Sequence, residues 1–425
     1  MSRRHAMGPP PGRSVAVVGS GVSGLVAAYL LHPEHRVTLF EANGYAGGHV
    51  HTLEVEEEGR SFSVDTGFIV YNETHYPRFT RLLRRLGVAS RPTEMSFSVK
   101  CARTGLEYAS TPPGRLFAQR RNLLRPSFHR MLADILRFNR TAPELLRDPG
   151  DTTPLGDYLA ARRYSRAFVE HHIIPLGSAL WSAPPDRMYE FPARYLVEFL
   201  ANHGFLRVRG RTPWRVIEGG SRCYVEALIR PFRERIRLDC PVVSVRRLRG
   251  GVEVRTRTGA ERFDEVILAV HSDQALRLLA EPTPAERQVL GAMPYQANEV
   301  VLHTDGSVLP RRRRAWASWN YYIPPDKGCP ATVTYNMNRL QGLRSRRPFC
   351  VTLNRTAEIA PERVLARMTY HHPVCTPASV AARKHRHRID GVGRIHYCGA
   401  YWGFGFHEDG VASALEVTRR FGRSL

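Results

Sequence analysis

A glycine-rich segment near the start of the chain has the residue types and spacing of a dinucleotide-binding turn. Gly19, Gly21 and Gly24 stand between a run of small and β-branched residues, typical of a buried strand, and a run of small and apolar residues that suits a helix. In this context the first glycine permits a tight turn, the second lets the backbone approach a pyrophosphate at the helix N-terminus, and the third lets helix and strand pack closely. The segment therefore predicts a dinucleotide-binding site.

An acidic residue follows at the place where the ribose of such a dinucleotide would lie. Glu41 ends the next strand-like run, R-V-T-L-F, about 20 residues beyond Gly19. A carboxylate at this position accepts hydrogen bonds from ribose hydroxyls and repels a 2′-phosphate. We therefore expect an unphosphorylated adenosine ribose.

Strand-like segments at the start, middle and end of the chain must come together to position these residues, whereas residues 76–202 are mostly helical in pattern. This order predicts an α/β fold, in which a discontinuous Rossmann-type domain is interleaved with a mixed-sheet and helical substrate domain. The segments read as strands are 14–18, 36–40, 242–246, 252–256, 265–270, 316–322, 332–338 and 394–400, and a terminal helix is predicted over 410–420. The predicted division is 13–75, 205–275 and 390–425 for the dinucleotide domain, 76–204 and 276–389 for the substrate domain, and 1–12 for a disordered leader.

Three further motifs decide which dinucleotide is expected. They are A-G-G-H at 46–49, S-V-D-T-G-F at 63–68 and C-G-A-Y-W-G-F-G-F-H-E-D-G-V-A-S-A at 398–414. Together with the first turn they resemble the flavin amine oxidase superfamily, which also holds protoporphyrinogen oxidases, carotenoid desaturases and polyene isomerases. The resemblance implies a glutathione reductase-like FAD-binding domain and FAD as the cofactor.

The same resemblance implies a role for each matching position. Gly47 and Gly48 would line the diphosphate and ribityl, Asp409 would lie by the ribityl, and Val411 would begin the helix directed at the flavin O2. Val243 would touch the adenine through its backbone. The full set of predicted FAD-binding residues is Gly19, Gly21, Val22, Ser23, Gly24, Glu41, Ala42, Gly47, Gly48, His49, Gly67, Val243, Gly399, Asp409, Gly410 and Val411.

Four other segments sharpen the resemblance to a bacterial subgroup of predicted NAD/FAD-binding, amine oxidase-like proteins linked to fatty-acyl methyltransferases. They are D-T-G-F-I-V-Y-N-E-T-H-Y-P at 65–77, N-M-N-R-L-Q at 336–341, H-H-P-V at 371–374 and G-F-H-E-D-G at 405–410. The subgroup implies an FAD-dependent oxidoreductase that moves hydride from a substrate C–H to flavin N5. A fatty-acyl or other lipid chain, desaturated in the reaction, is the expected substrate.

Two departures from the amine oxidase pattern keep other functions open. The paired-glycine motif ends in His49 where the superfamily usually has arginine, and the three lysines of the chain fit poorly to the lysine that holds a water near N5 in amine oxidases. The alternatives are a flavin amine oxidase that releases peroxide and a non-catalytic flavin- or lipid-binding partner of a fatty-acyl methyltransferase.

Histidines are the candidate catalytic residues. His407 could transfer a proton, because imidazole titrates near neutral pH, or it could only hydrogen-bond beside the glycine-rich loop. His372, next to His371, would lie near the isoalloxazine in the family's arrangement. Aromatic residues that could form the walls of a long apolar pocket are Tyr71, Tyr76, Trp181, Trp319, Tyr321, Tyr335 and Trp402.

The composition of the chain narrows the expected binding partners and cellular location. The formal net charge is +23, and almost all of the 62 basic residues are arginines, which indicates either an arginine-rich solvated surface or attraction to an anionic membrane. No nucleic-acid motif occurs, and seven cysteines without a C-x-x-C pair predict neither a disulfide framework nor a metal site. We expect a cytoplasmic protein with an apolar small-molecule substrate. Peripheral attachment to the inner face of the membrane, with the arginine run 311–314 as a lipid contact, is a further expectation.

Overall fold

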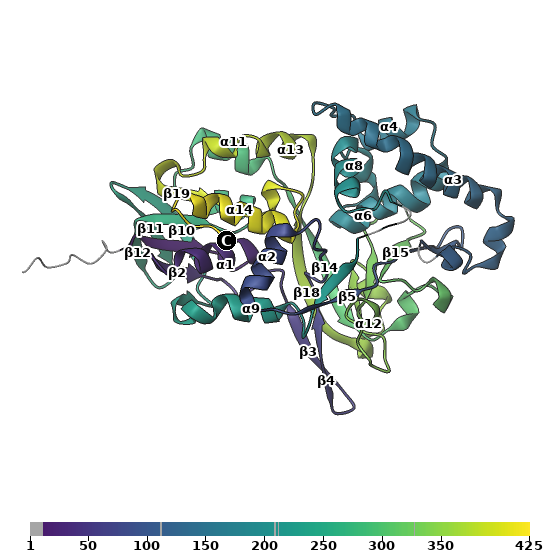
Figure 1. The fold of residues 1–425 in the computed structure, drawn as a ribbon, viewed down its shortest axis with the longest axis horizontal. Coiled ribbons are helices and arrows are strands. Elements are labelled where there is room, and N and C mark those ends of the chain that lie inside the picture. Colours follow the sequence, from purple (N-terminus) through teal and green to yellow (C-terminus); the bar gives the residue numbers. More distant parts are fainter. Residues whose placement is uncertain (1–11, 111–112, 208–209, 211, 327) are drawn as a thin grey trace, which may run out of the picture.

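The computed structural model describes residues 12–110, 113–207, 210, 212–326 and 328–425. The predicted leader at 1–12 lies outside these residues except for Gly12, and Lys327 lies outside them as well. Figure 1 shows two lobes, one built on a parallel sheet and one with helices above a mixed sheet. The exact domain boundaries stay a prediction.

A five-stranded parallel sheet gathers segments from both ends and the middle of the chain. Residues 15–18 and 265–268 at its centre are buried because both faces are covered, on one face by α1 (Val22–Leu31) and α14 (His407–Arg419), which pack against each other. This confirms the predicted α/β fold. In order, its strands are β19 (Ile395–Tyr397), β13 (Glu265–Leu268), β1 (Ser14–Val18), β2 (Arg36–Phe40) and β9 (Ile236–Arg237).

The predicted hairpin is present and continues into a third strand. β10 (Val242–Leu248), β11 (Gly251–Thr256) and β12 (Ala260–Phe263) form an antiparallel meander. Two two-stranded ribbons follow, β3 (Thr52–Glu57) with β4 (Arg60–Asp65) and β5 (Ser90–Thr93) with β8 (Trp214–Ile217). Figure 1 shows the β3–β4 hairpin projecting below the two lobes.

A seven-stranded mixed sheet forms the floor of the second lobe. The helical prediction for 76–202 is wrong over 90–109, where the chain forms strands instead. The reason is tertiary: residues 97–101 pair in parallel with residues 319–323, a partner that local pattern cannot reveal. In order, its strands are β18 (Val364–Pro373), β14 (Tyr295–His303), β17 (Cys350–Leu353), β16 (Val333–Asn336), β15 (Trp319–Ile323), β6 (Phe97–Cys101) and β7 (Glu107–Ala109).

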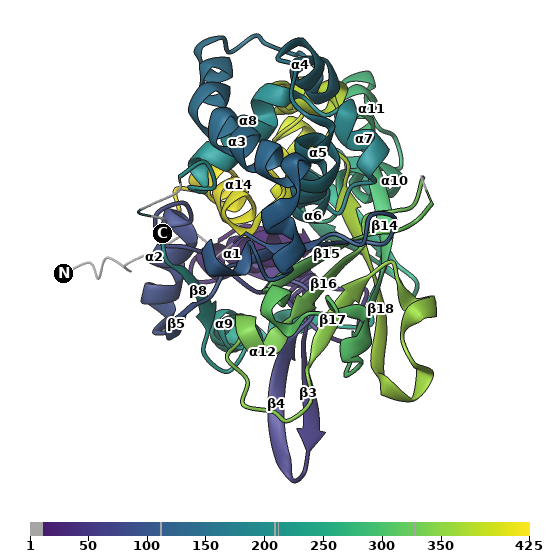
Figure 2. The same ribbon diagram turned by 90° about the vertical axis from the view of Figure 1, so that its right-hand side faces the viewer.

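Helices from the middle of the chain lie on one side of this sheet, as Figure 2 shows. They bury their apolar faces in one large core shared with the sheet. These helices are α3 (Pro126–Thr141), α4 (Leu155–Ala161), α5 (Arg166–Phe168), α6 (Ile174–Trp181), α7 (Pro185–Tyr189) and α8 (Ala193–Asn202). The other helices are α2 (Pro77–Leu86), α9 (Arg222–Ile229), α10 (Ser272–Leu278), α11 (Pro284–Gly291), α12 (Met337–Leu340) and α13 (Pro377–Arg383).

Within the described part of the chain, none of the helices is both long enough and apolar enough to cross a bilayer. All seven cysteines are free.

Candidate active site

The first glycine turn is closed by contacts that only glycine permits. A Cβ on Gly24 would lie 2.0 Å from the carbonyl oxygen of Gly19, whose own φ is +100°. A Cβ on Gly21, by contrast, would meet nothing within 4 Å. Helix α1 has no side-chain cap and no acidic residue in its first turn. Its N–H groups therefore face open space that suits an anion.

Glu41 lies at the end of β2, and its carboxylate is fully engaged by protein donors. Oε2 accepts from the Ser20 N–H at 2.9 Å and from its hydroxyl at 2.5 Å, while Oε1 accepts from the Asn43 N–H at 2.9 Å and its side-chain amide at 2.8 Å. A carboxylate accepts about four hydrogen bonds. A ribose hydroxyl must therefore displace the Ser20 hydroxyl or the Asn43 amide in order to bind.

The second glycine pair lies directly against the first turn. The N–H of Gly47 donates to the Ser20 carbonyl at 3.1 Å, and a Cβ on Gly48 would lie 3.0 Å from Gly21 Cα. Further along, a Cβ on Gly67 would lie 2.1 Å from the His49 carbonyl oxygen. These backbone contacts make one continuous surface from Glu41 to His49.

The C-terminal loop completes this surface. A Cβ on Gly410 would lie 2.6 Å from a Val22 methyl group and 3.1 Å from the Ser23 hydroxyl, and Gly399 donates its N–H to the Ser413 hydroxyl at 3.0 Å. We call the backbone surface around Gly19–Gly24, Gly47, Gly48, Gly67, Gly399 and Gly410 the glycine track.

The last helix begins earlier than predicted. It starts at His407 rather than at Val411, because the Asp409 carboxylate accepts from the Phe406 N–H at 3.0 Å and closes an earlier first turn. Val411 is thus buried inside the helix. Of the other predicted FAD residues, Ala42 is exposed and Val243 has 45% of its surface exposed.

The glycine track fits FAD. It offers an uncapped helix N-terminus for a diphosphate, backbone without Cβ atoms along its length, and Glu41 near its outer end. The individual FAD contacts stay predictions.

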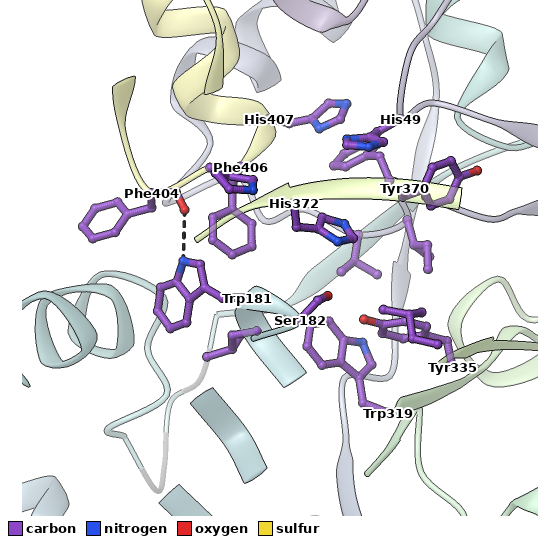
Figure 3. A pocket seen from close by; sticks show the side chains of 18 of the residues that line it. His49, Trp181, Ser182, Trp319, Tyr335, Tyr370, His372, Phe404, Phe406 and His407 are labelled. Carbon is purple, nitrogen blue, oxygen red and sulfur yellow. Dashed lines mark hydrogen bonds between the residues drawn. The ribbon is translucent and has the colours of Figure 1, made fainter. Parts of the chain in front are cut away.

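A cavity of about 190 Å³ opens at the inner end of the track, between the two lobes. Figure 3 shows His49 and His407 at one end of it and Trp319, Tyr335 and Ser182 at the other. Of the seven aromatic residues predicted as pocket walls, Tyr76, Trp181, Trp319 and Tyr335 line it, and Tyr71, Tyr321 and Trp402 do not. The sequence-predicted residues His49, Gly67, His372 and His407 all meet in this cavity.

No aspartate, glutamate, lysine or arginine is among the described residues that line the cavity. Its histidines are neutral as well. Burial lowers the pKa of His407 to about 3 and that of His372 to about 4, and burial together with neighbouring histidines holds the pKa of His49 well below its usual range. The cavity therefore carries no charge at neutral pH.

His407 is held in place by two neighbours. Its ring stacks on Phe68, with centroids 3.5 Å apart, and its Nε2 shares a 3.0 Å hydrogen bond with the Tyr224 hydroxyl. Its lowered pKa opposes the expected exchange of a proton near neutral pH, so any catalytic role must use the neutral imidazole. The catalytic role of His407 stays a prediction.

His372 is fixed by an amide. The Asn298 Nδ2 lies 2.9 Å from His372 Nδ1 and donates to it, which leaves the proton of the neutral ring on Nε2. The rings of His49 and His372 are 5.4 Å apart. His372 can therefore act as a hydrogen-bond donor in the cavity.

Two aromatic residues of the helical lobe hold the loop that precedes α14. Trp181 donates its indole N–H to the Phe404 carbonyl at 3.1 Å, drawn as a dashed line in Figure 3. The Tyr195 hydroxyl donates to the Gly403 carbonyl at 2.8 Å. The sequence predicts Trp181 only as a wall of the pocket and gives no sign of the role of Tyr195. No local signal could have found it, because its partner is about 200 residues away in the sequence.

A second, polar cavity of about 590 Å³ lies on the other side of α14. Asp409 lines it together with Arg383 and Lys384, and burial raises the pKa of Asp409 to about 6. Asp409 therefore serves the loop structure through Phe406, and its predicted ribityl contact stays a prediction.

Comparisons with known proteins identify the fold and the family. The model of the flavin-containing amine oxidoreductase family matches residues 22–334. L-amino-acid oxidases of Bothrops pauloensis and Demansia vestigiata are 23% and 24% identical over 328 and 310 residues, which are 69% and 67% of this chain. The matched regions are 59% and 56% of those proteins, so the chain spans less than two thirds of their length.

Solved structures share the fold at low sequence identity. Cyclohexylamine oxidase from Brevibacterium oxydans superimposes with a TM-score of 0.69 at 17% identity, covering 97% of this chain and 100% of that chain. A CLA-producing fatty acid isomerase from P. acnes gives 0.68 at 15% identity, with the same coverage. Because the family model covers most of the chain, from the helix of the glycine turn into the seven-stranded sheet, the chain belongs to the flavin-containing amine oxidoreductases, a family of FAD-dependent enzymes, and FAD is its cofactor.

Proposed function

We propose that the protein oxidises a C–H bond of a neutral, apolar molecule, and that this substrate is a fatty-acyl or other lipid chain. The observation that supports the proposal is the uncharged, aromatic and aliphatic lining of the cavity at the end of the glycine track. When bound, FAD supplies the hydride acceptor. Transfer of a proton from the neighbouring carbon to a water molecule completes the desaturation.

The lining disfavours the charged substrates of other flavin oxidases. An amino acid would bring an ammonium and a carboxylate into the cavity, and a polyamine would bring at least one ammonium. Among the described residues that line the cavity, none offers an opposite charge. Burying an unpaired ion is costly, so such substrates would bind weakly.

The polar groups of the cavity can orient a lipid. Trp319 presents a buried indole N–H that has no hydrogen-bond partner among the described residues. This indole N–H lies at the end away from His407 in Figure 3, so it can donate a hydrogen bond to the carbonyl oxygen of an acyl ester. The chain would then run towards His372 and His407 past Leu180 and Val300.

Anaerobic bleaching of the flavin tests the proposal without knowledge of the final electron acceptor. A phospholipid and a fatty acid methyl ester should bleach the flavin, whereas cyclohexylamine, putrescine and L-leucine should not. Bleaching by an amine or amino acid but by no lipid would overturn the proposal in favour of an amine oxidase. Tight FAD binding with no bleaching by either class would favour a non-catalytic binding partner.

A further inference from the structure

Among the large apolar residues that the structure describes, Leu124 has the most exposed side chain, and it lies in a short 3-10 helix, Arg120–Leu124. Leu124 has 87% of its surface exposed and its neighbour Leu123 has 52%. No acidic residue occurs in the sequence between Glu107 and Asp134. Two adjacent exposed leucines in a segment that carries only positive charge are unusual for a surface that faces water alone.

The fold brings a second basic segment to the same place. Glu107, on the edge strand β7, accepts the N–H groups of Arg311 and Arg312 at 2.9 and 3.2 Å. The carbonyl oxygen of the same Glu107 accepts from the Asn122 side chain at 3.1 Å. Residues 120–125 and 311–314, almost 200 positions apart, are therefore both anchored at Glu107.

The arginines of these two segments lack acidic partners. The described structure contains salt bridges for many other arginines, but none for those of 120–125 and 311–314. The one carboxylate at the junction, Glu107, is buried and satisfied by backbone N–H groups. Part of the +23 charge is thus concentrated beside the two leucines. We call this surface the docking face; it consists of Arg120, Arg121, Leu123, Leu124, Arg125, Arg311, Arg312, Arg313 and Arg314.

We propose that the docking face binds an anionic phospholipid bilayer. The arginines contact the lipid phosphates, and Leu123 and Leu124 enter the boundary between headgroups and acyl chains. Exposed leucines favour a bilayer over nucleic acid, whose backbone offers arginine partners but no apolar layer. This inference goes beyond the proposed oxidation, and its test requires no turnover.

Sedimentation with vesicles tests the docking face. The holoprotein should bind vesicles that contain phosphatidylglycerol, should bind pure phosphatidylcholine weakly, and should be released by salt, because the Debye length falls to about 10 Å at about 0.1 M. Equal binding to both vesicle types would overturn the charge-based proposal. Absence of any binding would overturn it entirely.

Two variants and two matched controls locate the surface. The triple variant Arg311→Gln, Arg312→Gln, Arg314→Gln should bind anionic vesicles about 10-fold more weakly or worse. The variant that removes three exposed arginines elsewhere, Arg60→Gln, Arg81→Gln, Arg257→Gln, loses the same charge and should bind far better. If both triple variants lose the same affinity, the net charge and not the docking face explains the binding.

Variants of Leu123 and Leu124 test independently whether apolar side chains enter the bilayer. Leu123→Ser with Leu124→Ser should lower binding about 10-fold, because apolar side chains no longer enter the bilayer. Leu136→Ser, at a position on α3 that has 57% of its surface exposed, should leave binding unchanged. The flavin absorbance of each variant reports that it is folded. Unchanged binding of the double leucine variant would overturn the insertion step.

Discussion

The glycine track and the cavity meet at His49 and Gly67, yet they are built in opposite ways. The track consists of backbone: at Gly24 and Gly67 a single added Cβ would lie 2.0 and 2.1 Å from a carbonyl oxygen. The cavity consists of side chains from both lobes, many of them aromatic. A surface made of backbone tolerates almost no change of residue type, whereas a wall of side chains can change its chemistry while the fold persists. Cofactor binding and substrate choice are therefore separable by mutation.

The largest effect is expected at the tightest point of the track. Gly24→Ala should destabilise the protein by about 1–3 kcal/mol or more and should release the flavin, because its Cβ overlaps the Gly19 carbonyl oxygen. Thermal unfolding and flavin absorbance measure both effects. A yellow Gly24→Ala protein of unchanged stability would show that the track is not rigid.

Gly21 is the matched control within the same turn. Gly21→Ala should leave the unfolding temperature of the apoprotein nearly unchanged, since its Cβ meets no protein atom within 4 Å. It should weaken FAD binding by about 10-fold or more, because the Cβ fills the space predicted for the diphosphate. Flavin titration of the apoprotein measures this, and unaltered affinity would place the diphosphate elsewhere.

In the cavity, removal of a single donor should change substrate binding without affecting the cofactor. Trp319→Phe keeps an aromatic wall but removes the unpartnered indole N–H, so we expect about 10-fold weaker apparent binding of a fatty-acyl reductant and normal flavin content. Trp316→Phe is the control, because the Trp316 indole N–H donates to the Pro310 carbonyl and Trp316 does not line the cavity. Equal effects of the two variants would remove Trp319 from substrate recognition.

A smaller effect is expected at His407. Proton transfer by His407 would predict that His407→Gln slows flavin reduction by about 10²-fold. Its pKa of about 3 and its stacking on Phe68 instead favour a neutral spacer, so we expect a loss of less than about 10-fold with FAD retained. Anaerobic stopped-flow reduction decides between these two results.

The smallest expected effect is that of pH. The folded pKa values of His407 and His372 lie below those of an ordinary histidine, so neither ring changes charge as pH rises above about 5. Neither histidine should therefore contribute an inflection to the rate of flavin reduction between about pH 5.5 and about pH 8. An inflection near about pH 6.5 that disappears in His372→Gln would show that His372 is charged during the reaction.

Much of the cofactor half could be predicted from the sequence, because its signals are local. Gly19, Gly21, Gly24 and Glu41 lie within one βαβ unit, and strand and helix periodicity place them in the structure as predicted. The last helix was predicted to begin at Val411 but begins at His407, because the Asp409 carboxylate accepts a hydrogen bond from the Phe406 N–H and closes an earlier first turn. The strands at 90–109 were missed because the partner of β6 lies at residues 319–323.

The sequence by itself determined the glycine turn, whose residues are close together along the chain, and also the family and the cofactor, through short local motifs that recur between residues 19 and 414. Only the tertiary structure decided that His407 and His372 are neutral, that Tyr195 holds the loop at Gly403, and that Asn122 and Arg311 meet at Glu107. The pKa values and the charge of the cavity depend on how deeply each side chain is buried. The surface patches depend on which distant segments of the chain lie close together. These quantities depend on which chain segments pack together, and the spacing of residues along a single segment does not contain that information.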